Sequence, residues 1–148
     1  MSLTTDIIFV KALKSNTELM AELADGDVYN TFIAMPDSGK DNAELPYIVV
    51  AFDGLTNDQS NKDDYEGETD SVQIGILMAA KTRPQLGQLA QAVRKTIHDY
   101  FVAEHNDEED ADMIPLDYQF SAKPVEYDTM KPCYVQEFTY LCDVKNSI

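Results

Sequence analysis

The chain has 148 residues, a length that suits one domain with a single hydrophobic core. Its hydrophobic fraction of 44% is too high for an intrinsically disordered chain. Lysine and arginine together number 11 against 27 aspartates and glutamates, and the formal net charge is -16. This balance argues against direct binding of duplex DNA or of an anionic membrane, because both need a basic patch.

The lack of a recognisable targeting signal and two cysteines that are expected to be thiols predict a protein of the cytoplasm. The sequence has neither the apolar segment of a signal peptide nor a run of about 18 apolar residues, so we expect no membrane span. Cys133 and Cys142 fall in one expected strand, where a rise of roughly 3.3 Å per residue would separate them by about 30 Å. A disulfide needs Cα atoms within roughly 7 Å, so two thiols are expected.

The N-terminus predicts an amphipathic helical region over about residues 4–24, broken near Ser15. Ser15 followed by Glu18 has the spacing of a capping box, which predicts a second helix start at that point. Gly26 predicts the helix end, because glycine tolerates the left-handed conformation of a cap. The apolar residues that recur at helical spacing are Leu3, Ile7, Val10 and Leu13.

Three strands are expected next. The segment DVYNTFIAM (27–35) predicts a short strand, and PYIVVAF (46–52) predicts a strand buried on both faces because it is almost continuously apolar. From Val72 onward, apolar residues alternate through Met78. A polar run at about 55–70 separates the last two strands, so they predict a hairpin with a long, mobile loop.

Residues 83–104 carry the clearest helical pattern of the chain. Pro84 stands in the first turn, where the missing N–H of proline is tolerated. One apolar stripe follows the helix, and its residues are Leu86, Leu89, Ala90, Val93, Ile97 and Phe101.

Strand patterns return after a second acidic run, which predicts another mobile loop at about 105–113. Alternation covers 116–120 and then 125–127, and CYVQEFTYLCDV (133–144) predicts a strand with Tyr134, Phe138 and Tyr140 on one face. The element order is α-β-β-β-α-β-β within a single domain of residues 1–148. This order predicts an α+β fold, a mainly antiparallel sheet on which the N-terminal helical region and the long helix pack.

The loop at 55–70 is the first candidate for a site. A calcium loop that starts at Asn57 would place Lys62 where the motif needs glycine, and strands flank the run where helices are required. Three interpretations stay open: a solvated loop, a loop that becomes ordered against a protein partner, and an adventitious divalent-cation site. The candidate interaction residues are Asp58, Lys62, Asp63, Asp64, Tyr65 and Glu66.

No pattern of catalytic residues stands out. His98 and His105 lack cysteine or carboxylate partners at zinc spacing, and His98 borders the apolar stripe as a surface residue would. The sequence contains neither G-x-S-x-G nor a glycine-rich phosphate loop. We therefore expect a protein that is not an enzyme and that has no cofactor and no metal centre.

The order of these segments resembles the small tail-completion or tail-terminator proteins of phages and prophages. The resemblance lies in GDVYNTFIAM, in LPYIVVAFDG with the polar loop after it, and in SVQIGILMAAKTRPQLGQLAQAVRKTI. It covers about residues 5–101, while the C-terminal strands match in kind only. In that family a strand opened by Pro-Tyr precedes a variable loop and a strand that enters the long helix.

The resemblance implies a ring, expected to contain six subunits, that caps the finished tail tube and presents a surface to the head. The implied partners are other copies of the chain, the tail-tube protein and the head-tail connector or neck protein, without specific nucleic-acid binding and without a membrane. It implies assembly in the bacterial host cytoplasm and a final place in the tail or neck of the virion. Passing DNA would then meet an acidic lumen, for which the candidates are Glu108, Glu109, Asp110 and Asp112.

Two alternatives remain open from the sequence. The protein could instead be a head-completion or neck stopper component, which differs in its partner and not in these sequence features. It could also be a small acidic binding module that mimics DNA or binds divalent cations. Self-association separates a terminator from a mimic, which we expect to be monomeric.

Overall fold

The computed structural model describes residues 2–31, 44–56, 69–103 and 114–145. A short 3-10 helix at Ser2–Thr4 opens the chain. The helices are α1 (Thr5–Ser15), α2 (Thr17–Leu23) and α3 (Arg83–Val102). The strands are β1 (Val28–Asn30), β2 (Tyr47–Thr56), β3 (Thr69–Ala80), β4 (Asp117–Ala122), β5 (Glu126–Asp128) and β6 (Cys133–Lys145).

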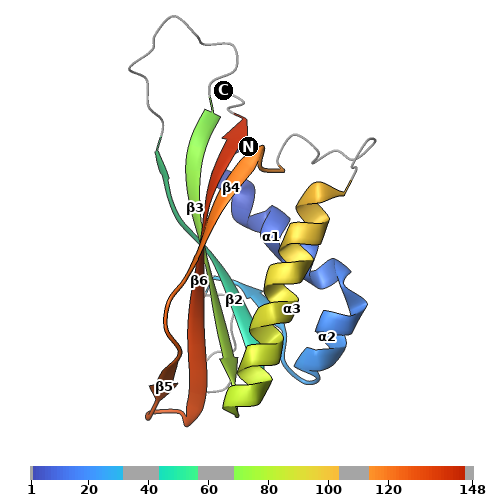
Figure 1. Ribbon diagram of the computed structural model, residues 1–148, viewed down its shortest axis with the longest axis vertical. Coiled ribbons are helices and arrows are strands. Elements are labelled where there is room, and N and C mark those ends of the chain that lie inside the picture. The colour runs from blue at the N-terminus through green and yellow to red at the C-terminus, as the bar shows by residue number, and fades with distance from the viewer. Residues whose placement is uncertain (1, 32–43, 57–68, 104–113, 146–148) are drawn as a thin grey trace, which may run out of the picture.

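The described strands form one twisted sheet, and the helices cover one of its faces (Figure 1). The strand order is β1-β2-β3-β6-β4, with β5 pairing to the other end of β6. All neighbours are antiparallel except β1 and β2, which run parallel. The α+β fold predicted from the sequence is therefore confirmed, with one parallel pair and a separate strand β5 that the sequence pattern had not resolved.

The break between α1 and α2 is where the sequence placed it, but Ser15 is not the capping residue. The side chain of Asn16 accepts hydrogen bonds from the N–H groups of Glu18 (3.0 Å) and Leu19 (3.2 Å). Ser15 instead donates its hydroxyl to the carbonyl of Ala12 within the last turn of α1. Asparagine is as good an N-cap as serine, and the next residue along the chain has taken the role.

Gly26 is also not the left-handed cap that the sequence predicted. The positive φ after α2 belongs to Ala24 (φ 52°), not to Gly26. A Cβ atom on Gly26 would lie 1.7 Å from the carbonyl oxygen of Pro46. Glycine is therefore required here because two backbone segments approach closely, which local sequence patterns do not reveal.

The long hairpin of β2 and β3 is confirmed. Thr56 pairs with Ser71 at the open end of the ladder, so the 57–68 segment connects two paired strands. On β2, Ile48 and Val50 join the core beneath the helices, whereas Tyr47 and Val49 belong to a smaller cluster on the opposite face. Strand β2 is thus buried on both sides along its first half, as its continuous apolar run predicted.

Helix α3 packs its apolar stripe on the sheet as expected. Its N-cap is Thr82, whose hydroxyl accepts a hydrogen bond from the N–H of Gln85 (3.2 Å), and Pro84 lies in the first turn. Phe101 is partly buried. The remaining stripe residues are buried, namely Leu86, Leu89, Ala90, Val93 and Ile97.

The C-terminal strands carry the aromatic part of the core. Phe9 of α1 meets the ring of Phe101 at 5.1 Å and the ring of Tyr140 at 5.3 Å between centroids. Tyr118 and Phe120 pack on Tyr140 from β4, at 5.5 and 5.2 Å. This layer fixes how β4, β6 and the end of α3 lie against each other.

The two cysteines lie on opposite faces of β6 and form no disulfide. Cys142 belongs to the core beneath the helices, and Cys133 to the smaller cluster on the other face. Burial raises the pKa of the Cys142 thiol to about 12, with Asp143 adding to the rise. The thiol is therefore protonated and inert, as a core cysteine should be.

Candidate interaction surfaces

The site residues predicted from the sequence lie outside the described residues. The first set, at 58–66, belongs to the segment that connects β2 and β3, and the second set, at 108–112, belongs to the segment that follows α3. The structure thus confirms the strands and the helix that these segments connect, and the roles proposed for Asp58, Glu66, Glu108 and Asp112 stay predictions.

Neither a metal cluster nor a membrane helix occurs in the part of the chain that the structure describes. Among these residues no group of three or more His, Cys, Asp and Glu side chains could hold a metal ion. None of the described helices is long and apolar enough to cross a membrane.

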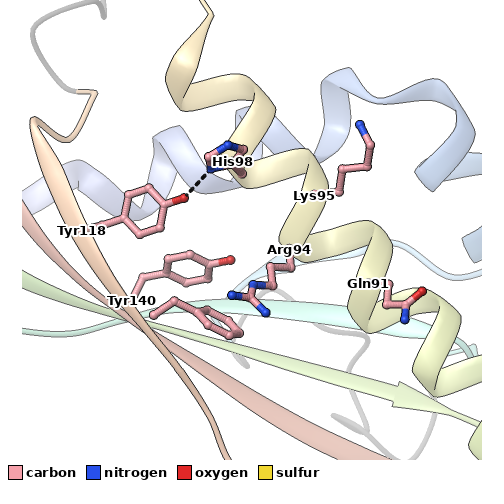
Figure 2. Close-up of a pocket in the computed structure, with 7 residues that line it drawn as sticks. Gln91, Arg94, Lys95, His98, Tyr118 and Tyr140 are labelled. Carbon is pink, nitrogen blue, oxygen red and sulfur yellow. Dashed lines mark hydrogen bonds between the residues drawn. The ribbon is translucent and has the colours of Figure 1, made fainter.

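A groove between α3 and β4 has a volume of about 360 Å³. Helix α3 forms one wall, and the edge of the sheet forms the other (Figure 2). The lining residues are Gln91, Arg94, Lys95 and His98 from α3, Tyr118 and Phe120 from β4, and Tyr140 from β6. We call this hollow the α3–β4 groove.

The helix wall of the groove is basic in a chain that is strongly acidic. The guanidinium carbon of Arg94 lies 4.3 Å from the centroid of the Phe120 ring, a cation–π contact that holds the side chain over the groove. Lys95 is engaged by Asp99 one turn further along α3. Arg94 forms no ion pair with any of the described residues.

A hydrogen bond closes one end of the α3–β4 groove. Nδ1 of His98 lies 3.0 Å from the hydroxyl oxygen of Tyr118, and this contact joins α3 directly to β4. His98 is exposed, in agreement with its prediction as a surface residue. In the described structure this side chain connects α3 to β4.

The hydroxyl of Tyr140 has no hydrogen-bond partner in the described structure. The residue is 1% exposed, and its oxygen is buried at the base of the groove (Figure 2). Burial raises the pKa of this hydroxyl, with the neighbouring Tyr118 adding to the rise and Arg94 opposing it. The group is therefore a protonated donor without an acceptor, and an unpaired buried hydroxyl is costly.

A second hollow lies on the face of the sheet opposite to the described helices, which we call the open face. It has a volume of about 100 Å³, and its lining residues are Val49, Ala51, Asp53, Gly75, Leu77 and Glu137. The ladder of β2 and β3 shifts register between Phe52 and Gly54, and the carboxylate of Asp53 covers Gly75. A Cβ on Gly75 would lie 2.3 Å from Oδ2 of Asp53, so the glycine makes room for this carboxylate.

The carboxylates of the open face influence each other. Burial raises the pKa of Asp53, and Glu137 raises it further, while Lys123 lowers it. Nζ of Lys123 lies 3.3 Å from Oε2 of Glu137 and forms an exposed salt bridge. Around this hollow, apolar strand residues therefore lie beside the carboxylates of Asp53 and Glu137 and the ammonium group of Lys123.

Sequence patterns alone did not identify the α3–β4 groove. Arg94 and His98 are four residues apart, so their common helix face was available from the spacing. Tyr118 and Tyr140 were placed on strands, but nothing in the sequence indicated that β4 lies at the sheet edge beside α3. The unpaired hydroxyl of Tyr140 is a property of the packed molecule and has no sequence signal.

Comparison with known proteins supports the fold. No family model matches the sequence, and no curated protein matches it. Among solved structures, a chain of the "Virion of native gene transfer agent (GTA) particle" is similar, with a TM-score of 0.58 and 14% sequence identity. The likeness covers 93% of this chain and 92% of that chain, so the two chains share one fold over nearly their whole lengths.

Proposed function

We propose that this protein is a structural component of a phage or phage-like virion. The observation that carries the proposal is the shared fold with a chain of a gene transfer agent particle, which extends over 93% of this chain and 92% of the other. The resemblance of residues 5–101 to tail-completion proteins points independently to the same class of assembly.

Within that class, the role that we propose is a tail terminator, a ring that caps the tail tube and joins it to the head. A closed ring needs two different surfaces on every subunit, because each copy contacts one neighbour on each side. The α3–β4 groove and the open face of the sheet lie on different parts of the fold, which supports separate contacts on each subunit. The loop at 55–70 would provide the contact with the tube.

The net charge of -16 suits a ring through which DNA passes. Like charges repel the duplex, so an acidic lumen lets DNA slide without being held. The repulsion acts over a Debye length of about 10 Å at moderate salt. This proposal assigns the protein a role in assembly and transit, and it requires no catalytic step and no cofactor.

The experiment that tests the proposal measures the solution mass and the binding to tails. Light scattering on a sizing column, at high protein concentration and with and without millimolar divalent cation, should give a mass near six subunits. Negative-stain images should show rings. A protein that remains monomeric in both buffers and also fails to bind purified tail tubes would contradict the proposal.

A neck component is the second virion role to be tested. It would share the ring and the fold and would differ only in its partner. Binding to purified tails that lack heads supports the terminator, whereas binding only to DNA-filled heads supports the neck component. A monomer that competes with DNA for a basic protein would instead favour an acidic binding module.

A further inference from the structure

We propose that the α3–β4 groove receives a carboxylate side chain from an extended acidic segment of a second copy of this chain. The inference rests on the proposed function, because a ring requires contact between copies. It goes further by naming the receiving surface and the chemistry that it recognises.

The base of the groove is built for an acceptor. The Tyr140 hydroxyl is a protonated donor, the residue is 1% exposed, and the described residues offer its oxygen no partner. Buried polar groups are paired in nearly all native structures, so an unpaired hydroxyl in a lined hollow marks a place where a partner atom belongs. A carboxylate oxygen is an acceptor that this hydroxyl can bond.

The wall of the groove supplies the charge. Arg94 stacks on Phe120, which fixes the direction of its guanidinium, and it forms no ion pair with the described residues. The planar guanidinium matches a carboxylate in geometry and in charge. Lys95 is engaged by Asp99. The arginine and the buried phenol therefore converge on one ligand type (Figure 2).

The free edge of β4 explains why the incoming segment should be extended. Among the described residues, no strand pairs with the outer edge of β4. The N–H of Lys123 donates to the carbonyl of Glu137 in β6, so the alternation of an antiparallel ladder turns the N–H groups of Tyr118 and Phe120 outward. The Tyr118 N–H is covered by the side chain of Asp117. The edge at Phe120 can thus pair with a further strand whose side chains reach the groove.

Charge identifies the occupant as a second copy. Each copy carries 27 carboxylates against 11 basic residues, so copies at net charge -16 repel each other over most of their surfaces. Self-assembly then needs a place on every subunit that accepts negative charge from its neighbour. Arg94 is one of two arginines in the chain. In the described structure it lines the α3–β4 groove together with Tyr140, whose buried hydroxyl has no acceptor there.

The test compares self-association of four proteins by light scattering and sedimentation equilibrium over a concentration series. These are the wild type, Arg94→Ala, Tyr140→Phe and the control Arg83→Ala, which removes the same charge from the exposed start of α3. We expect Arg94→Ala to weaken association about tenfold or more, Tyr140→Phe to weaken it severalfold, and Arg83→Ala to leave it unchanged. Thermal melting of each monomer checks that the fold is retained.

Hydrogen exchange locates the contact. On association of the wild type, the amide of Phe120 should become protected, and in Arg94→Ala it should stay as in the monomer. Rings that form equally well in all four proteins would overturn the groove contact and leave the proposed function standing. A wild type that stays monomeric at high concentration, or that binds acetate or citrate in the groove without associating, would also overturn it; tail-tube binding then tests the proposed function separately.

Discussion

The side-chain nitrogen of Asn16 donates a hydrogen bond of 2.8 Å to the hydroxyl oxygen of Thr96, 80 residues away in the chain. The same asparagine caps α2 through its side-chain oxygen. Asn16 therefore starts α2 and also connects the junction of α1 and α2 to α3. The outer face of α3 forms one wall of the α3–β4 groove. This bond adds a polar contact to the apolar stripe that holds α3 on the core.

Replacement of Asn16 by alanine should lower the free energy of unfolding by about 2 kcal/mol. Loss of the cap costs about 1 kcal/mol, and loss of the bond to the buried Thr96 hydroxyl adds about 1 kcal/mol. Urea denaturation measures the effect. Ser15→Ala is the control and should cost less than half as much, because Ser15 bonds only within its own helix. Equal costs would contradict the larger role given to Asn16.

Two glycines should respond to alanine in opposite directions. At Gly26 the new Cβ would meet the Pro46 carbonyl oxygen at 1.7 Å, and the backbone must move, so we expect a loss of stability of about 3 kcal/mol, at the upper end of the range for overpacking. At Gly87, in the middle of α3, a Cβ meets nothing within 4 Å. There alanine should stabilise by about 0.5–1 kcal/mol through its higher helix propensity. Thermal or urea unfolding of both variants gives the signs.

Asp53→Asn should stabilise the protein more at pH 7 than at pH 4. Burial and Glu137 raise the pKa of Asp53 in the folded state, so folding favours its protonated form. Stability is then lost as the pH rises from the unfolded pKa through the raised folded value. Asparagine removes this dependence. The comparison is between urea midpoints of variant and wild type at the two pH values, with the exposed Glu22→Gln as the control.

Deletion of residues 58–66 should leave folding intact and abolish capping of tail tubes. The paired ends of β2 and β3 close the hairpin without these residues, since Thr56 and Ser71 already face each other. Circular dichroism and melting test the fold, and tail length in an assembly reaction tests capping. Loss of the fold, or tails of normal length, would each refute the docking role of this loop.

Reversal of Asp110 and Asp112 to lysine should slow the passage of DNA through an assembled particle. The two substitutions remove two negative charges and add two positive ones, a net change of +4 per subunit, and a ring multiplies this change around the lumen. The slowing should weaken as salt is raised, because screening shortens the reach of the charges. DNA ejection rates measure the effect, with mass measurements to verify that rings still form. Unchanged rates would place this acidic run away from the channel.

The sequence was sufficient to predict the main helices and strands and which side of each is buried. The stripe of α3 and the alternation of β3 were read directly, since helices repeat every 3.6 residues and strands every two, and burial selects apolar residues at those positions. It also predicted correctly that Cys133 and Cys142 cannot be joined, because the two residues lie nine positions apart on one strand. Such properties are local, and each depends on one element at a time.

The N-cap of α2 and the close approach of the Gly26 and Pro46 backbones were not predicted correctly. Ser15 and Asn16 are both good N-caps, and the choice between them depends on Thr96, which lies in another helix. Gly26 is a residue typical of a helix end, yet glycine is needed there because the Pro46 backbone approaches it closely. Likewise, the parallel pairing of β1 with β2 is not encoded in the three residues of β1.

By itself the sequence determined the α+β class, the long hairpin, the acidic charge and the resemblance to tail-completion proteins. The packed fold was needed to show that no described strand pairs with the outer edge of β4, which lies beside α3. It was also needed to show that Arg94 stacks on Phe120 over a Tyr140 hydroxyl that has no partner among the described residues. The physical reason is that periodicity records which side of an element is buried. Which elements meet, and which polar groups are left without a partner, depends on packing between residues far apart in the chain.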